Sequence, residues 1–431
     1  MLQDRYGLAL STSSEKAAAL YIDGGDRMLA ADAGVEATLT NTINEDPQFA
    51  LAHAALARYH QMRGRSKLAR RAIVEAETLV ANASTRERQH VAILQLLING
   101  DMQGSLTLTH EHLRDYPRDA FALDPACGVF GSIGFSGRTN REDEQLALLE
   151  PLVGHYGNDW WFNTVYAFAL LETGQYLRAT SLVERALSIR PRSAHAAHTK
   201  MHALFEVGDD IAARDFLAGW LPASERGSLL HCHIWWHYAL TLMATDDQSA
   251  AFTALCDNCL PGATDSPSIN VFTDCVSFLW RAELAGAPRN LALWETLRSY
   301  YDEQFHRPIV FVDAHVGLVY AALGDRERLD ECIRELQALG EANKLPAGTT
   351  AATLTRGYKA FVSGAWDDAI ALLEPTLNEL VRIGGSRAQR DLQVNTLLAA
   401  YSRAGRVEDA NALLAHTADR QPARPIEGFS T

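Results

Sequence analysis

The stretch WWFNTVYAFALLETGQYLRATSLVERALSIRP, from Trp160 to Pro191, decides the fold of this chain. Gly174 separates two apolar segments that are each long enough for a helix, and the proline ends the second one. Ala179 and Ala186 stand where the two helices would cross, and small side chains there let helices pack closely. The stretch therefore predicts a pair of packed helices joined by a tight turn.

The same register returns 34 residues later, at Gly208 and Ala213. It recurs less faithfully around Gly64, Gly364 and Gly405, with a spacing that drifts from 34 to about 41 residues. A period of 34 is that of the tetratricopeptide repeat, a helix–turn–helix unit that stacks into a solenoid. The expected fold is all-α, an α-solenoid of roughly eight or nine degenerate tetratricopeptide-like helix pairs, curled into a superhelix around a central pocket.

The repeats fill residues 1–417 as a single domain, and residues 418–431 read as an irregular C-terminal tail with three of the chain's prolines and glycines. The 431 residues are 47% hydrophobic and 21% charged, as expected for a protein with a substantial core. A net charge of −14 without basic tracts argues against nucleic acid and against an anionic membrane surface as partners. The N-terminus lacks a leader-like pattern, and the expected location is cytoplasmic.

Six cysteines are scattered without a framework spacing, which favours reduced, packed side chains. Cys256 and Cys259 form a single CxxC that has no second CxxC and no strand–helix context. Packing is therefore preferred over a redox or metal role for this pair.

Polar side chains interrupt apolar, aromatic helices in the second half of the chain. His198 and His202 are four residues apart, as are His233 and His237, so each pair shares one helix face. The structural interpretation of these pairs is that the histidines are hydrogen-bonded where helices pack together. The alternatives are ligand binding or catalysis, and a zinc-type metal site in which Asp274 or His315 completes the ligand set.

The residue after the first histidine of each pair is Thr199 or Ile234, where the usual metalloprotease motif has glutamate. That motif is absent. We therefore expect no cofactor, with the zinc-type metal at the histidine cluster kept as the less favoured alternative.

Two later helices carry charge. Asp274 and Arg281 lie seven residues apart on one helical stripe, where they form a structural ion pair or leave Arg281 to hold an anionic substrate. Asp313 either caps the helix that follows Pro308 or orients His315 as a general base. Since first helices of such repeats line the concave surface, these residues are expected to converge there.

Taken in order, several stretches resemble those of the tetratricopeptide-repeat-38 family, nearly from end to end. They are Asp46–His53, Thr85–His90, Pro117–Ala120, Ala167–Gly174, Ala197–His198 with Glu206 and Gly208, Trp235–Leu240, Asp274–Arg281, Phe311–His315 and Gly384–Asp391. This chain has Arg387 where that family usually has histidine. The resemblance implies a helical-repeat fold with a polar, histidine-containing centre, and it implies no particular reaction.

Three functions from different classes remain. The first is an enzyme of hydrolase, lyase or isomerase type that binds a small, possibly anionic organic molecule in an internal pocket and transforms it by acid–base chemistry. The residues assigned to it are His237, His315, Asp313 and Asp274 as catalytic groups, and Arg281, His198, His233, Trp236, Gln389 and Arg390 as substrate-binding groups.

The second function is a scaffold that binds a peptide or protein partner in its concave groove, and the third is a non-catalytic small-molecule binder. An enclosed, convergent pocket favours small-molecule chemistry, whereas polar groups dispersed along an open groove favour the scaffold. The tryptophans of the second half, Trp236 among them, are core residues or line an apolar cavity. A homodimer is compatible with the sequence, which does not fix the stoichiometry.

Overall fold

The computed structural model describes residues 1–416, 419–420 and 422–427. Over these residues the regular structure is helical, with isolated bridges at Gln3 to Ala9 and Pro261 to Thr264 and no longer strand. Each helix packs mainly against its neighbours in sequence. The predicted all-α helical-repeat fold is confirmed. No helix in these described ranges is both long enough and apolar enough to cross a membrane.

The helices up to residue 220 are α1 (Glu15–Leu29), α2 (Val35–Glu45), α3 (Ala50–Met62), α4 (Ser66–Leu79), α5 (Thr85–Ile98), α6 (Met102–Asp115), α7 (Ala120–Leu123), α8 (Arg141–Leu149), α9 (Val153–Tyr156), α10 (Trp160–Glu172), α11 (Tyr176–Ile189), α12 (Ala194–Glu206) and α13 (Asp210–Trp220). The later helices are α14 (His231–Ala244), α15 (Gln248–Asn258), α16 (Ser268–Leu284), α17 (Leu291–Gln304), α18 (Val310–Leu323), α19 (Arg326–Glu341), α20 (Gly348–Val362), α21 (Trp366–Leu373), α22 (Arg387–Arg403) and α23 (Val407–His416). Short 3-10 helices are η1 (Val80–Asn82), η2 (Asp124–Ala126), η3 (Glu150–Leu152), η4 (Leu221–Ala223) and η5 (Glu374–Ile383).

The stretch that opened the sequence analysis forms α10 and α11, which pack against each other. Ala179 and Ala186 are fully buried in this contact. Gly174 makes the turn with a positive φ of 79°, a conformation that costs glycine no strain. The turn and the small residues thus have the roles that the sequence predicts.

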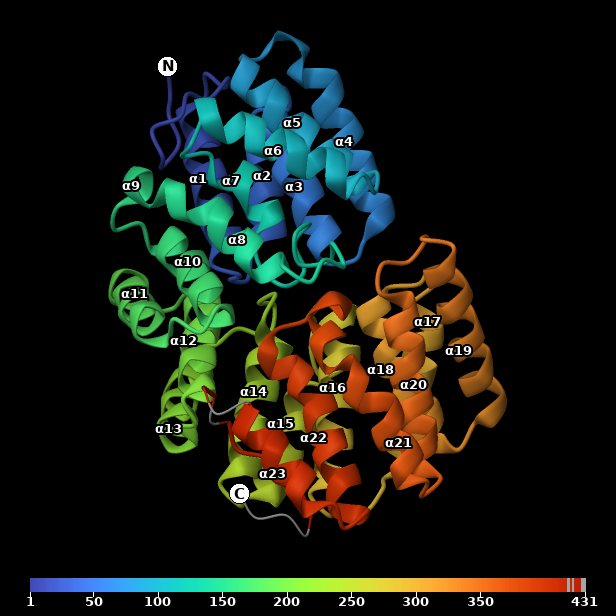
Figure 1. The fold of residues 1–431 in the computed structure, drawn as a ribbon. Helices are drawn as coiled ribbons and strands as arrows, with labels where there is room; N and C mark the ends of the chain where they lie inside the picture. Colours follow the sequence, from blue (N-terminus) through green and yellow to red (C-terminus); the bar gives the residue numbers. More distant parts are fainter. Residues whose placement is uncertain (417–418, 421, 428–431) are drawn as a thin grey trace.

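The solenoid curls back so that its C-terminal helices lie beside helices of its middle, away from the N-terminal helices (Figure 1). The last long helix, α22, packs on α16 and reaches α12. At the start of α8, Arg141 donates hydrogen bonds to the carbonyls of Val381 (2.7 Å) and Gly385. The backbone N–H of Arg387 donates to the carboxylate of Glu172 (3.1 Å). Residues more than 200 positions apart in sequence therefore close the centre of the molecule.

Two apolar cores fill the structure. One lies among the helices up to α14, and the other runs from α14 to the C-terminal helices. Trp235 and Tyr238 of α14 pack against both cores. The polar centre lies where the two cores meet, because α12 and α14 also carry the histidine pairs.

The predicted boundary between repeats and tail falls on residues 417–418, outside the described residues. The described part of the tail is irregular, as expected, yet it does not lie on the outer surface. Arg424 and Ile426 are buried, with 4% and 6% of their surface exposed, and the Glu427 N–H donates to the carbonyl of Leu284 at the end of α16. The tail therefore crosses the inner face of the solenoid.

Candidate metal and acid–base centre

Four histidines converge between α12 and α14. The spacing of four residues places His198 and His202 on one face of α12, and His233 and His237 on the facing side of α14. One ligand nitrogen from each ring lies within 4.8 Å of the others. The closest pair of nitrogens, Nε2 of His198 and Nε2 of His202, is 2.9 Å apart. We call these four residues the histidine cluster.

The cluster is deeply buried and poorly satisfied. His237 has no exposed surface, and neither of its ring nitrogens has a hydrogen-bond partner within the described part of the chain. The same holds for Nδ1 of His202. An unsatisfied buried polar group costs about 1–3 kcal/mol, so a ligand that these nitrogens bind would recover that cost.

Three of these imidazoles are held neutral. Burial, followed by the neighbouring histidines, lowers the pKa of His198, His202 and His237 well below the ordinary value. Neutral imidazole is the form that binds metals and accepts protons.

Asp274 orients one member of the cluster. Its Oδ2 lies 2.8 Å from Nδ1 of His233, and the carboxylate is 1% exposed. A carboxylate at Nδ1 keeps the proton there and leaves Nε2 free to bind a ligand. Trp236 stacks on the His233 ring at 5.1 Å between ring centres, which limits its rotation. Both sequence-predicted residues therefore touch the cluster.

Gln389 and Arg281 reach the same centre but are largely occupied. The Gln389 side chain caps α22 by accepting from the Ser386 N–H (3.0 Å), and it lies 3.5 Å from Asp274. Arg281 donates to Ser277 and to the carbonyl of Ala388 (2.8 Å), with its guanidinium over the Trp236 ring. Arg281 thus ties α16 to α22, a role that the anion-holder hypothesis did not include.

Asp313 and His315 have other contacts. The Asp313 carboxylate accepts from the Ile309 N–H (2.8 Å) at the start of α18 and from the Tyr301 hydroxyl (2.9 Å). It therefore caps the helix, which was one of its two predicted roles. His315 Nδ1 lies 2.7 Å from the carbonyl of Phe311 one turn earlier in the same helix. Neither residue belongs to the group of four histidine ligands.

Carboxylates that the sequence analysis did not select lie beside the cluster. Glu172 ends α10, Glu206 ends α12, and both lie within ligand distance of His202. Guanidinium groups already accompany them: Arg390, a predicted site residue, lies 3.6 Å from Glu172, and Arg420 of the tail pairs with Glu206. These pairs leave the four-histidine group as the better site for a cation.

Glu172 has the properties of a proton carrier. Burial and the charge of Glu142 raise its pKa to about 8. Arg390 donates to Glu142 and lies close enough to stabilise both carboxylates. At neutral pH Glu172 therefore holds a proton that it can release with small changes in its surroundings.

A signal for these two glutamates was present in the register. Glu172 and Glu206 are 34 residues apart, and each stands two positions before the turn glycine of its repeat. No known protein-family model matches this chain. The site therefore has to be interpreted from its own chemistry.

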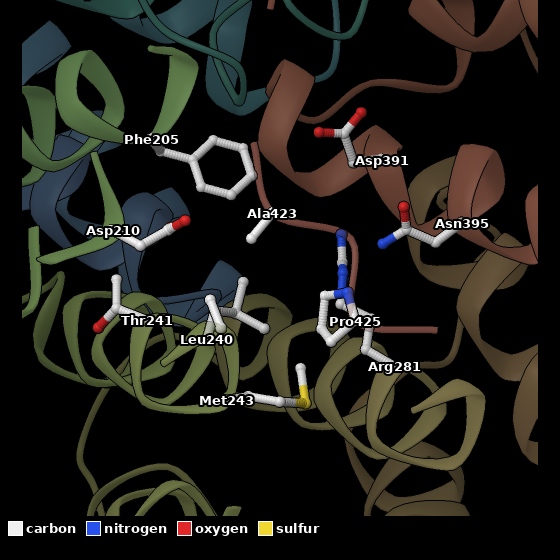
Figure 2. A pocket seen from close by; sticks show the side chains of 11 residues that line it. Phe205, Asp210, Leu240, Thr241, Met243, Arg281, Asp391, Asn395, Ala423 and Pro425 are labelled. Atoms are coloured by element: carbon white, nitrogen blue, oxygen red, sulfur yellow. The ribbon is translucent and has the colours of Figure 1, made fainter. Parts of the chain in front are cut away.

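A pocket between Arg281 and the described part of the tail is small (Figure 2). Its cavity of about 20 Å³ has room for roughly one water molecule. Arg281, Asp391 and Asn395 line it together with apolar side chains such as Phe205, and Pro425 of the tail forms one wall.

The CxxC pair lies elsewhere and is suited to packing. Cys259 is fully buried, and its thiol donates to the carbonyl of Cys232 (3.3 Å). Burial raises the pKa of Cys259 to about 11, so this thiol stays protonated at neutral pH and is a poor metal ligand.

Proposed function

We propose that this protein is a metal-binding helical-repeat protein whose histidine cluster holds a divalent transition-metal ion. One observation carries the proposal: four imidazoles, from two i, i+4 pairs, place a ligand nitrogen each within 4.8 Å of the others in a buried site. All-imidazole sites suit zinc, copper and nickel among the available metals.

A tetrahedral ion needs small shifts of the ligand nitrogens, which lie within 4.8 Å of one another. Zinc–nitrogen bonds of 2.0–2.1 Å place tetrahedral ligand atoms about 3.3 Å apart. The 2.9 Å separation of the His198 and His202 nitrogens needs to widen by only a few tenths of an ångström. Asp274 supplies the carboxylate partner that metal-ligating histidines usually have.

The chemistry that this centre best supports is hydrolysis of a small molecule by acid–base catalysis. Four imidazoles complete a tetrahedral ligand set, so a metal ion there would supply Lewis acidity only where a fifth position admits water or substrate, and Glu172, with its pKa of about 8, would carry the proton. This reassigns the proton-transfer role that the sequence analysis gave to His237 and His315. An anion held by Arg281 receives no support, because that guanidinium already bonds to α22.

Metal content tests the first part. Protein purified without chelator and then dialysed against zinc is expected to hold one zinc ion per chain, measured by elemental mass spectrometry. Replacement of zinc by cobalt should give the visible absorption of a tetrahedral cobalt site. His237→Gln should abolish both signals. His195→Gln is the matched control, because His195 lies on α12, contacts the carbonyl of Leu29 and is not one of the four possible ligands. Equal metal content in both variants would contradict the proposal.

Turnover of p-nitrophenyl acetate by the metal-loaded protein tests the second part. Glu172→Gln is expected to keep the metal and lose most of the metal-dependent rate, since glutamine cannot carry the proton. An unchanged rate would show that Glu172 does not carry the proton, and it would not contradict metal binding. A cytoplasmic location, kinship with the tetratricopeptide-repeat-38 family and the scaffold alternative stay predictions.

A further inference from the structure

The strongest charge contacts of the inner face involve the chain's own tail. Arg420 donates to Glu206 Oε1 (3.0 Å) and to both carboxylate oxygens of Asp391 (2.9 and 3.0 Å), and its Nε also bonds to Glu206. The two carboxylates come from α12 and α22 and are 1% and 3% exposed. A planar guanidinium fits between two carboxylates in this bidentate way, and an ammonium does not.

A second guanidinium follows. Arg424 donates to Asn395 Oδ1 (2.8 Å), one helical turn beyond Asp391 on α22, and lies 3.6 Å from Asp391 itself. We call Glu206, Asp391 and Asn395 the arginine socket. Because its members belong to α12 and α22, the socket remains part of the solenoid wherever the tail lies.

The segment that fills the socket is held by these side chains and by Ile426, which is buried in the second apolar core. Among the described residues 419–420 and 422–427, the backbone makes one hydrogen bond to the solenoid backbone, from the Glu427 N–H to Leu284. Ala423 and Pro425 form part of the pocket wall opposite Phe205 (Figure 2). Withdrawal of this segment would enlarge the pocket and free the socket, next to His202 and the metal-binding centre.

We propose that the arginine socket is a binding site for an alkylguanidinium group, and that the tail occupies it here as an exchangeable intramolecular ligand. The inference names the ligand class of the proposed centre and to that extent rests on the proposed function, although guanidinium binding itself needs no metal. It reverses the charge expected from the sequence: the pocket selects a cation where an anion was predicted. Glu206 and Asp391 select it by charge and by the geometry of the fork.

The test removes the intramolecular competitor. In the full-length Arg420→Ala/Arg424→Ala variant, N-butylguanidinium is expected to bind at least about tenfold more tightly by calorimetry than in the wild type, because an occupied site lowers apparent affinity. Butylammonium, which lacks the planar fork of donors, and N-butylurea, which lacks the charge, should both bind with much lower affinity. Adding Asp391→Asn should abolish the gain. Equal affinities in variant and wild type, or equal binding of butylammonium, would overturn the proposal.

If that variant does not fold, the proposal can still be tested by hydrogen exchange on the wild-type protein. Saturating N-butylguanidinium should accelerate hydrogen exchange at the Glu427 amide several-fold, because displacement of the tail breaks its bond to Leu284. N-butylurea is the control. Exchange that does not respond overturns the idea of an exchangeable tail.

Two further arms complete the design. An acetylated, amidated Gly-Arg-Gly peptide that binds at least tenfold more tightly than N-butylguanidinium assigns the socket to arginine in a peptide, and equal binding assigns it to a free small molecule. Metal content is measured in every sample. Metal retained without guanidinium binding sinks this inference alone, and guanidinium binding without metal sinks the metal proposal alone.

Discussion

Asp274 is a single carboxylate on which the geometry of the histidine cluster depends. It fixes His233 from Nδ1, so its removal would free the ring to rotate and to change tautomer. We expect Asp274→Asn to weaken zinc binding about 10–100-fold in a competitive chelator titration.

The matched control for that substitution is Asp119→Asn. Asp119 is equally buried and contacts His90 and His112 in the N-terminal half, away from the cluster. Zinc affinity should not change in this variant even if its stability falls. A similar loss of affinity in both variants would mean that a general loosening, and not the orientation of His233, weakens the site.

Glu172 makes stability depend on pH in a defined direction. Its pKa in the folded state, about 8, lies above the ordinary 4.5, so its favourable contribution is complete below pH 4.5 and is lost as the pH rises toward 8. Glu172→Gln cannot ionise and should gain stability over the wild type by up to about 1.4 kcal/mol per pH unit.

Urea unfolding of both proteins at pH 5, 6.5 and 8 measures that difference. The histidine cluster loses stability toward acid, since the pKa of His237 is lowered by burial, but it does so in both proteins and cancels. Unfolding curves that keep a constant separation across this range would show that Glu172 ionises normally.

At the scale of single helices, the sequence contained much of what was needed. The spacing of four residues predicted that His198 and His202 share a face, and the Gly174 turn predicted α10 and α11. What it could not supply was which faces meet, because that depends on how strongly the solenoid curls. Gln389 shows the limit: the same side chain serves as a helix cap and as a neighbour of Asp274.

The packing of α11 on its neighbours gives a prediction for one element. Ala186→Leu would force extra volume into a fully buried helix contact and should lower the unfolding free energy by about 1–3 kcal/mol. Leu177→Ala on the same helix is the control, since Leu177 is 90% exposed. Denaturant unfolding should show a lower midpoint for the first variant and little change for the second. A tolerated leucine would mean that the contact is looser than the structure indicates.

At the scale of the whole molecule, closure of the curled solenoid depends on long-range bonds that no periodicity encodes. Glu206 and Arg420 are 214 residues apart in sequence, and nothing in the local pattern of either predicts their meeting. The tail was therefore predicted to be irregular without any hint that it lies inside.

Arg141 is the clearest test of this closure. Arg141→Met would leave the carbonyls of Val381 and Gly134 without this donor, and hydrogen bonds to charged groups are worth about 1.5–3 kcal/mol each. We expect a lower urea midpoint and faster hydrogen exchange in α22. Arg138→Met, which removes an exposed pair with Glu144, should change stability by about 0.5 kcal/mol or less. Unaltered exchange in α22 would contradict the closing role of Arg141.

The closure of the solenoid also means that the centre of the molecule is completed late during synthesis. A ribosome releases residues 198–237, and with them all four histidines, well before residues 381–427 exist. A nascent chain could therefore meet its metal while the centre is still open to solvent. Residues translated later then bring Arg390 beside Glu172 and Arg420 beside Glu206. A chain cut short by a late stop codon would keep its histidines and leave those buried carboxylates unpaired.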